Sequence, residues 1–146
     1  MKAYIKQDSK KEKEDCDYQD VTSLFPSIKT MKIEIKDFKC PSMNASYAGR
    51  HWTKRKKQTD EIHELVYYAC YEQKTKPVKK YPVTLSFDVY YKDKRRRDID
   101  NLSVKEIIDG LVRAGIIKDD CDKYVKEIRK RIIRGDDNKV VIKIIK

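Results

Sequence analysis

The most constraining feature of this sequence is an alternation of side-chain types over residues 83–91. Apolar residues recur there at every second position, the period of a β-strand that buries one face against a core. They are Val83, Leu85, Phe87, Val89 and Tyr91. The stretch runs directly into a group of arginines and then into Asp98. The sequence therefore predicts that Asp98 follows the end of a strand.

Three further segments carry a clear period. Met31, Ile33 and Ile35 alternate with charged residues, which predicts another strand. Apolar residues spaced by three and four predict helices over residues 54–72 and 101–114. These patterns indicate a domain that contains both strands and helices.

The segment 123–145 is open to two interpretations. Its first half suits a helix as well as a strand, because its apolar spacing fits both periods. The β-branched residues, the turn sequence at 135–138 and the apolar run at 140–145 favour a β-hairpin. The expected fold is a single α+β domain, with a mixed β-sheet of about four strands and two main α-helices.

The N-terminal residues differ in character from the rest. Residues 1–27 are polar and of mixed charge, and we expect them to form an extension. A short strand or helix around Val21 to Phe25 that packs on the domain is the alternative. The domain itself is expected to span residues 28–146.

The ends of the second predicted helix carry their own signals. Asp100, Asn101 or Ser103 could cap its start, and Ser103 with Glu106 has the spacing of a capping box. Gly115 is placed to end it in a left-handed conformation.

The charge of the chain indicates its kind of partner. The 146 residues carry a formal net charge of +11, which favours an anionic partner. Charge alone does not separate DNA, RNA, a ribosome or a membrane surface. No apolar run approaches the ~20 residues of a membrane span, and no apolar core of a signal peptide follows Met1. We expect no membrane partner and a cytoplasmic location.

The four cysteines are scattered and form no Cys-X-X-Cys pair. With only two histidines in the chain, a zinc site would need ligands from distant segments. We therefore predict reduced thiols, with Cys70 facing the core.

Asp98 and Asp100 lie directly after the arginines. If this segment is extended, their side chains leave the same face and their Cα atoms lie roughly 6.6–7 Å apart. Both carboxylates could then reach one hard cation such as Mg²⁺. The alternative for an Asp-X-Asp sequence alone is a turn with a helix N-cap.

The wider sequence separates these two alternatives. It resembles the RusA-type Holliday-junction resolvases, small metal-dependent endonucleases of bacteria and phages. The matching residues are Asp98-Ile99-Asp100-Asn101-Leu102, Lys105, Asp109-Gly110-Leu111, Ala114-Gly115 and Asp119-Asp120. Upstream, the resemblance extends to Pro41-Ser42-Met43-Asn44 and the basic helix after it, from about Met31 onward. One residue between Leu102 and Lys105 is extra relative to the commoner pattern.

The resemblance implies a function and a set of site residues. The function is cleavage of four-way DNA junctions by paired nicks, carried out by a homodimer with Mg²⁺, for which Mn²⁺ is a possible substitute. Asp98, Asp100 and Asp120 would bind the metal and act as catalytic residues, with Lys105 as a catalytic lysine beside the scissile phosphate. Asp109 would support the site.

The extra residue bears on Lys105. If it lies in an irregular turn before the helix, Lys105 keeps the family position. If the helix already begins at Asn101, the match is rotated by ~100°. Val104 is in register with Ile108 and Leu111, so we predict that Val104 is buried and that Lys105 lies on the helix flank.

Two basic groups are expected to contact DNA phosphates without reading the base sequence. They are Arg95, Arg96 and Arg97, and Lys54, Arg55, Lys56 and Lys57. A competing hypothesis is a non-catalytic basic module that binds branched DNA or RNA. An RNA-binding protein would explain the charge but would leave the acids without a role.

Overall fold

The computed structural model describes residues 30–47, 49 and 51–146. The predicted N-terminal extension, and the alternative strand or helix around Val21 to Phe25, lie outside the described residues.

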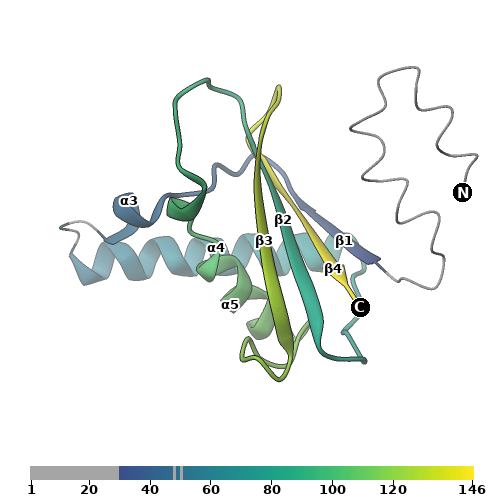
Figure 1. The fold of residues 1–146 in the computed structure, drawn as a ribbon. Helices are drawn as coiled ribbons and strands as arrows, with labels where there is room; N and C mark the ends of the chain where they lie inside the picture. Colours follow the sequence, from purple (N-terminus) through teal and green to yellow (C-terminus); the bar gives the residue numbers. More distant parts are fainter. Residues whose placement is uncertain (1–29, 48, 50) are drawn as a thin grey trace, which may run out of the picture.

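A mixed four-stranded sheet forms one layer of the domain (Figure 1). Its strands are β1 (Thr30–Ile35), β2 (Val83–Tyr91), β3 (Val125–Arg134) and β4 (Lys139–Ile145). They lie in the order β1-β4-β2-β3. β4 is antiparallel to both of its neighbours, whereas β2 and β3 are parallel. The predicted α+β fold with a mixed sheet is confirmed.

The predicted hairpin is wrong in its pairing. Both of its strands exist, but β2 lies between β3 and β4. The connection crosses the end of β2, where Gly135 N donates to Tyr91 O at 3.1 Å. A Cβ on Gly135 would lie 3.1 Å from the Tyr90 ring, so the crossing is a close one. In this position β2 is buried on both faces. Turn chemistry and strand propensity describe only the local chain, so they do not predict a strand inserted between β3 and β4.

Two helices cover the apolar face of the sheet (Figure 1). They are α4 (Trp52–Glu72) and α5 (Lys105–Arg113). Their buried side chains join those of the strands in one core, which includes Cys70 as predicted. The helices cross closely at Gly110, where an added Cβ would lie 3.0 Å from Val66 Cβ. Gly115 has φ +78° and follows the end of α5, as predicted.

The second helix begins later than predicted. Residues Ile99–Asn101 form a 3₁₀ turn, η1, and α5 begins at Lys105. The backbone between η1 and α5 pairs with a distant segment of the chain. Leu102 forms an isolated antiparallel β-bridge with Ser42, and Ser103 N donates to Pro41 O at 3.0 Å. The short helix α3 (Met43–Tyr47) follows this contact. The 41–44 motif therefore holds the segment between η1 and α5 in place.

The predicted capping box does not form as such. Val104 occupies the N-cap position and makes no side-chain cap. The Ser103 hydroxyl instead donates to Glu106 Oε1 at 2.7 Å, and both residues are buried.

The other face of the sheet carries a buried carboxylate. Asp88, at 3% exposure, receives two hydrogen bonds from Arg131 and an ion pair from Lys143. Long basic side chains thus cover a face that the helices leave open. None of the helices in the described ranges is long and apolar enough to cross a bilayer.

Candidate nucleic-acid and metal site

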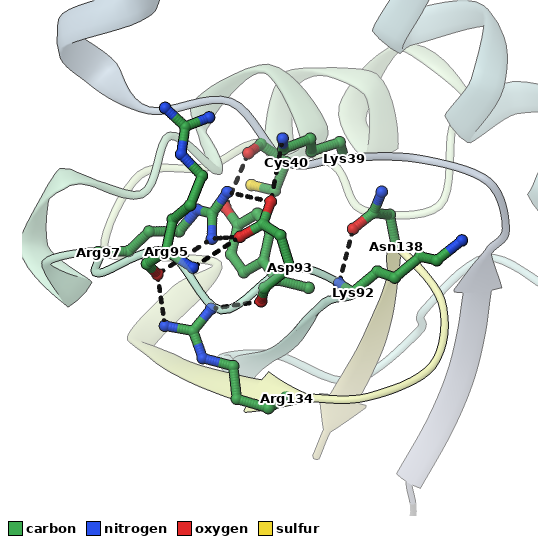
Figure 2. A network of polar contacts seen from close by, with 9 residues as sticks. Lys39, Cys40, Lys92, Asp93, Arg95, Arg97, Arg134 and Asn138 are labelled. Carbon is green, nitrogen blue, oxygen red and sulfur yellow. Dashed lines mark hydrogen bonds and ion pairs between the residues drawn. The ribbon is translucent and has the colours of Figure 1, made fainter.

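The arginine loop (residues 92–97) connects β2 to Asp98 and is closed around one carboxylate (Figure 2). Asp93 Oδ1 accepts from Arg97 Nη1 at 2.6 Å and from Arg95 N at 3.0 Å. Asp93 Oδ2 accepts from Arg97 Nη2 at 2.9 Å and lies 3.2 Å from Lys39 Nζ. The Arg97 guanidinium, followed by these other donors, holds the pKa of Asp93 far below its usual range.

Arg97 is also fixed by an aromatic ring. Its guanidinium carbon lies 3.7 Å from the centre of the Tyr91 ring, and the Tyr91 hydroxyl donates to Cys40 O at 2.8 Å. Burial raises the pKa of Tyr91 to about 12, so the phenol stays protonated and keeps this hydrogen bond. The hydrogen bond to Asp93 raises the pKa of Arg97. Arg97 is therefore part of the loop's own framework.

The backbone of the arginine loop is held from the neighbouring strand ends. Arg134, the last residue of β3, donates to Arg95 O at 2.8 Å and to Asp93 O at 3.3 Å. Lys92 N donates to Asn138 Oδ1 at 2.9 Å, in the turn before β4. Figure 2 shows Arg134 below the loop and Lys39 above it. The loop is thus tied to β3, to the β3–β4 turn and to the segment after β1.

Asp98 and Asp100 are both exposed at the end of this loop. Asp98 is extended, with φ −95° and ψ 132°, but Asp100 lies within η1. The extended Asp98–Asp100 geometry assumed from the sequence is therefore wrong beyond Asp98. Among the described residues, no three side chains of the His, Cys, Asp and Glu types gather into a metal-binding group.

Asp120 lies at the opposite end of the sheet from Asp98. Asp98 follows the end of β2, whereas Asp120 precedes the start of the parallel strand β3, whose Val125 pairs with Val83. Helix α5 runs between the two loops, and Figure 1 shows the arginine loop and the loop after α5 at opposite ends. Within one chain, the fold does not bring Asp120 to Asp98 and Asp100.

Lys105 is the first residue of α5, so the extra residue of this sequence falls in the irregular segment before the helix. In this arrangement the lysine is expected to keep the family position. Val104 is buried at 6% exposure, as predicted, and Lys105 is exposed. The Lys105 ammonium lies 3.0 Å from Asp109 Oδ2, one turn further along the helix.

A pocket of about 550 Å³ opens beside Asp98. The basic residues that line it are Lys39, Arg95, Arg96 and Arg97, and Ser42 and Asn101 are among its polar lining residues. Arg95 joins the loop network only through its backbone, and both Arg95 and Arg96 are exposed. Of the three arginines, two present their side chains to solvent, and the third is committed to Asp93.

The second basic group lies in the first turns of α4. Lys54, Lys56 and Lys57 are exposed and Arg55 is half-buried. Lys56 forms an ion pair with Asp60 at 2.9 Å. α3 precedes this end of α4, and Asn44 N donates to Asn101 Oδ1 at 3.2 Å. This contact puts the basic start of α4 at the same end of the domain as η1.

Sequence reasoning missed three residues that build this site, namely Lys39, Asp93 and Arg134. Asp93 carries a local signal, because it lies four residues before an arginine. Lys39 and Arg134 carry none, since Lys39 reaches the loop from the segment after β1 and Arg134 from the end of β3, both distant in sequence.

Exposed carboxylates beside an arginine-rimmed pocket combine groups that bind a cation with groups that bind a phosphate, on a small basic α+β scaffold. The model of the family described as Endodeoxyribonuclease RusA matches residues 40–145. The chain belongs to this family, and membership indicates an endodeoxyribonuclease that resolves Holliday junctions. A comparison with curated proteins gives no match.

Proposed function

We propose that this protein is a Mg²⁺-dependent resolvase that cuts four-way DNA junctions by paired nicks. The observation that carries the proposal is the position of Asp98 and Asp100 at the end of a rigid loop that also presents Arg95 and Arg96. Two carboxylates that can bind a cation therefore lie within a few residues of two guanidinium groups that can bind a phosphate.

The side chains at this position fit a hard divalent cation. Asp98 and Asp100 offer only oxygen donors, which Mg²⁺ and Mn²⁺ both accept. Both are exposed, and neither carboxylate has a hydrogen bond or ion pair in the described part of the chain. Neighbouring carboxylates repel each other, and a cation would relieve that repulsion. When bound, the cation would supply an activated water and stabilise the charge that develops on the phosphodiester.

The third acid is proposed to come from a second copy of the chain. Asp120 is separated from Asp98 by the length of α5. A two-fold axis that crosses the middle of α5 would place Asp120 of each copy beside Asp98 and Asp100 of the other. An isologous contact of this kind builds two equivalent sites. Two sites match a junction, in which two strands are cut.

Exposed apolar side chains lie where such a contact would form. Ile128 on β3 is 46% exposed and Ile99 on η1 is 50% exposed. Lys130 Nζ donates to Leu102 O at 3.3 Å, which brings this part of β3 against the residues that follow η1. Ile128 lies two residues nearer the start of β3, towards the Asp120 loop. Ile128 therefore lies between the two groups of acids, and Ile99 lies within the first group, between Asp98 and Asp100.

The remaining roles follow from charge and position. Arg95 and Arg96 would bind the backbone phosphates beside the cut, and the lysines and arginine at the start of α4 would extend that contact. Lys105 would carry its ammonium from the exposed flank of α5 towards the scissile phosphate. None of these side chains reads a base edge in this arrangement, so we expect affinity to depend on salt and on DNA shape.

Cleavage of a labelled synthetic junction tests the proposal. The junction and a linear duplex of the same sequence are incubated with the protein in Mg²⁺, in Mn²⁺ or in EDTA. We expect symmetric nicks in the junction with either metal, none in EDTA and none in the duplex. Asp100→Asn should abolish the nicks and still bind the junction in EDTA. Binding by wild type without nicks in either metal would instead favour the non-catalytic module.

A further inference from the structure

Asp93 lies outside the proposed metal and phosphate contacts, yet its carboxylate lies at the centre of the arginine loop and joins three other residues there (Figure 2). Its carboxylate accepts four interactions, from the side chains of Arg97 and Lys39 and from the backbone of Arg95. A carboxylate with this many donors is fully ionised at neutral pH, in keeping with its lowered pKa.

The two Arg97 bonds form a bidentate pair, the geometry that adds most rigidity to an arginine–carboxylate contact. Arg97 precedes Asp98 directly, and its guanidinium is clamped between Asp93 and the Tyr91 ring. The main chain at Arg97 therefore has little freedom. Whatever holds Arg97 also sets the direction in which Asp98 leaves the loop.

The Asp93 carboxylate also neutralises two cations, Arg97 and Lys39, that could otherwise bind DNA phosphates. Arg97 and Lys39 both line the pocket beside Asp98, and both direct their charge at Asp93. Without that carboxylate, each would be available to a phosphate in the pocket. Asp93 thus lowers the positive charge that faces DNA while it orders the chain that carries Asp98.

We propose that Asp93 is a positioning residue of the nuclease site, which directs Asp98 through Arg97 and holds Arg97 and Lys39 away from the DNA backbone. The inference rests on the proposed nuclease function. It predicts opposite effects on two measurable quantities when the Asp93 charge is removed. The rate of cleavage falls, because Asp98 is no longer held. The affinity for junction DNA rises, because two cations are released.

The test uses the full-length Asp93→Asn variant. Single-turnover cleavage of the junction should slow by about 10- to 100-fold, the effect expected of a ~1 Å displacement of a reacting group. Junction binding in EDTA should be tighter than for wild type. Its dependence on log salt should steepen by up to ~0.9 for each new phosphate contact. Asp136→Asn, which removes an exposed acid from the β3–β4 turn, is the matched control and should leave the cleavage rate unchanged.

A second variant separates positioning from simple loss of structure. Arg97→Gln breaks the same contact from the other side, so it should slow cleavage to a similar extent without tightening binding. The double variant should be no slower than either single variant, because both changes remove one shared interaction. Thermal unfolding of each variant shows whether it is folded before its rate is compared.

Several outcomes would overturn the inference. Asp93→Asn could cleave at the wild-type rate, or lose affinity together with rate. The two single effects could also multiply in the double variant. An independent readout comes from NMR of the protein without DNA. The Arg97 guanidinium protons should exchange slowly with water in wild type and quickly in Asp93→Asn. If wild type cuts no junction at all, the nuclease proposal fails, and the NMR and binding measurements still decide the role of Asp93.

Discussion

Lys105 and Asp109 form an ion pair along the exposed side of α5, with 3.0 Å between Nζ and Oδ2. The lysine precedes the acid by four residues, which is the weaker order for such a helical pair. Both side chains are substantially exposed, so the pair contributes little to stability. We therefore expect the ammonium to exchange Asp109 for a phosphate when DNA is present.

This relationship gives the first prediction. Lys105→Ala should slow single-turnover cleavage markedly at saturating Mg²⁺ and should change junction affinity only modestly. Its free energy of unfolding should stay within about 0.5 kcal/mol of wild type, because alanine is a good helix former and the ion pair is exposed. Lys118→Ala removes an exposed lysine beyond the end of α5 and serves as the control. A wild-type cleavage rate in Lys105→Ala would show that the lysine has no part in the reaction.

The second prediction tests whether two copies share each site. Asp100→Asn and Asp120→Asn are each expected to be inactive. In a mixed dimer, one of the two sites would contain the intact Asp98 and Asp100 of one copy and the intact Asp120 of the other. A dimer purified through two different tags should therefore nick one strand of the junction. Complete inactivity of the mixed dimer would mean that all three acids act within a single chain.

The third prediction concerns the individual arginines of the loop. Arg96→Ala should lower the slope of log affinity against log salt by ~0.9, because it removes one phosphate contact. Arg97→Gln should leave the slope unchanged, since Arg97 is already neutralised by Asp93. Both slopes are measured by titrating a labelled junction in EDTA over a range of salt. Equal slopes for wild type and Arg96→Ala would show that Arg96 faces away from the DNA.

The fourth prediction concerns the contact between the two helices. Gly110→Ala places a Cβ 3.0 Å from Val66 Cβ, and Val66 is fully buried and β-branched. Overpacking of this kind costs about 1–3 kcal/mol, more than the ~1 kcal/mol that alanine gains over glycine in a helix. Thermal or urea unfolding should show a less stable protein. In a Val66→Ala background the same change should cost less, and an equal cost in both backgrounds would argue against this contact.

Much of the fold could be predicted because the period at which apolar residues recur differs between strands and helices. The alternation in β2 and β1 and the helical spacing in α4 and α5 are present in the sequence, and each element forms near its expected residues. The pairing of β3 with β2 could not be predicted. The β-branched residues and the turn indicate that β3 and β4 are strands, but they do not show that β2 lies between them. The late start of α5 depends on Pro41 and Ser42, which are far from it in sequence.

For the site, the sequence alone was sufficient to identify the exposed acids, the adjacent arginines and the family to which the chain belongs. Their motif is contiguous, and its residue types are those that bind cations and phosphates. The tertiary structure alone decided that Arg97 turns inward to Asp93, that Arg95 and Arg96 remain exposed, and that Asp120 lies at the far end of α5. These outcomes depend on Tyr91, Arg134 and Lys39 and on the parallel pairing of β2 with β3. Contacts between distant residues set the direction of each side chain, and local sequence patterns do not contain that information.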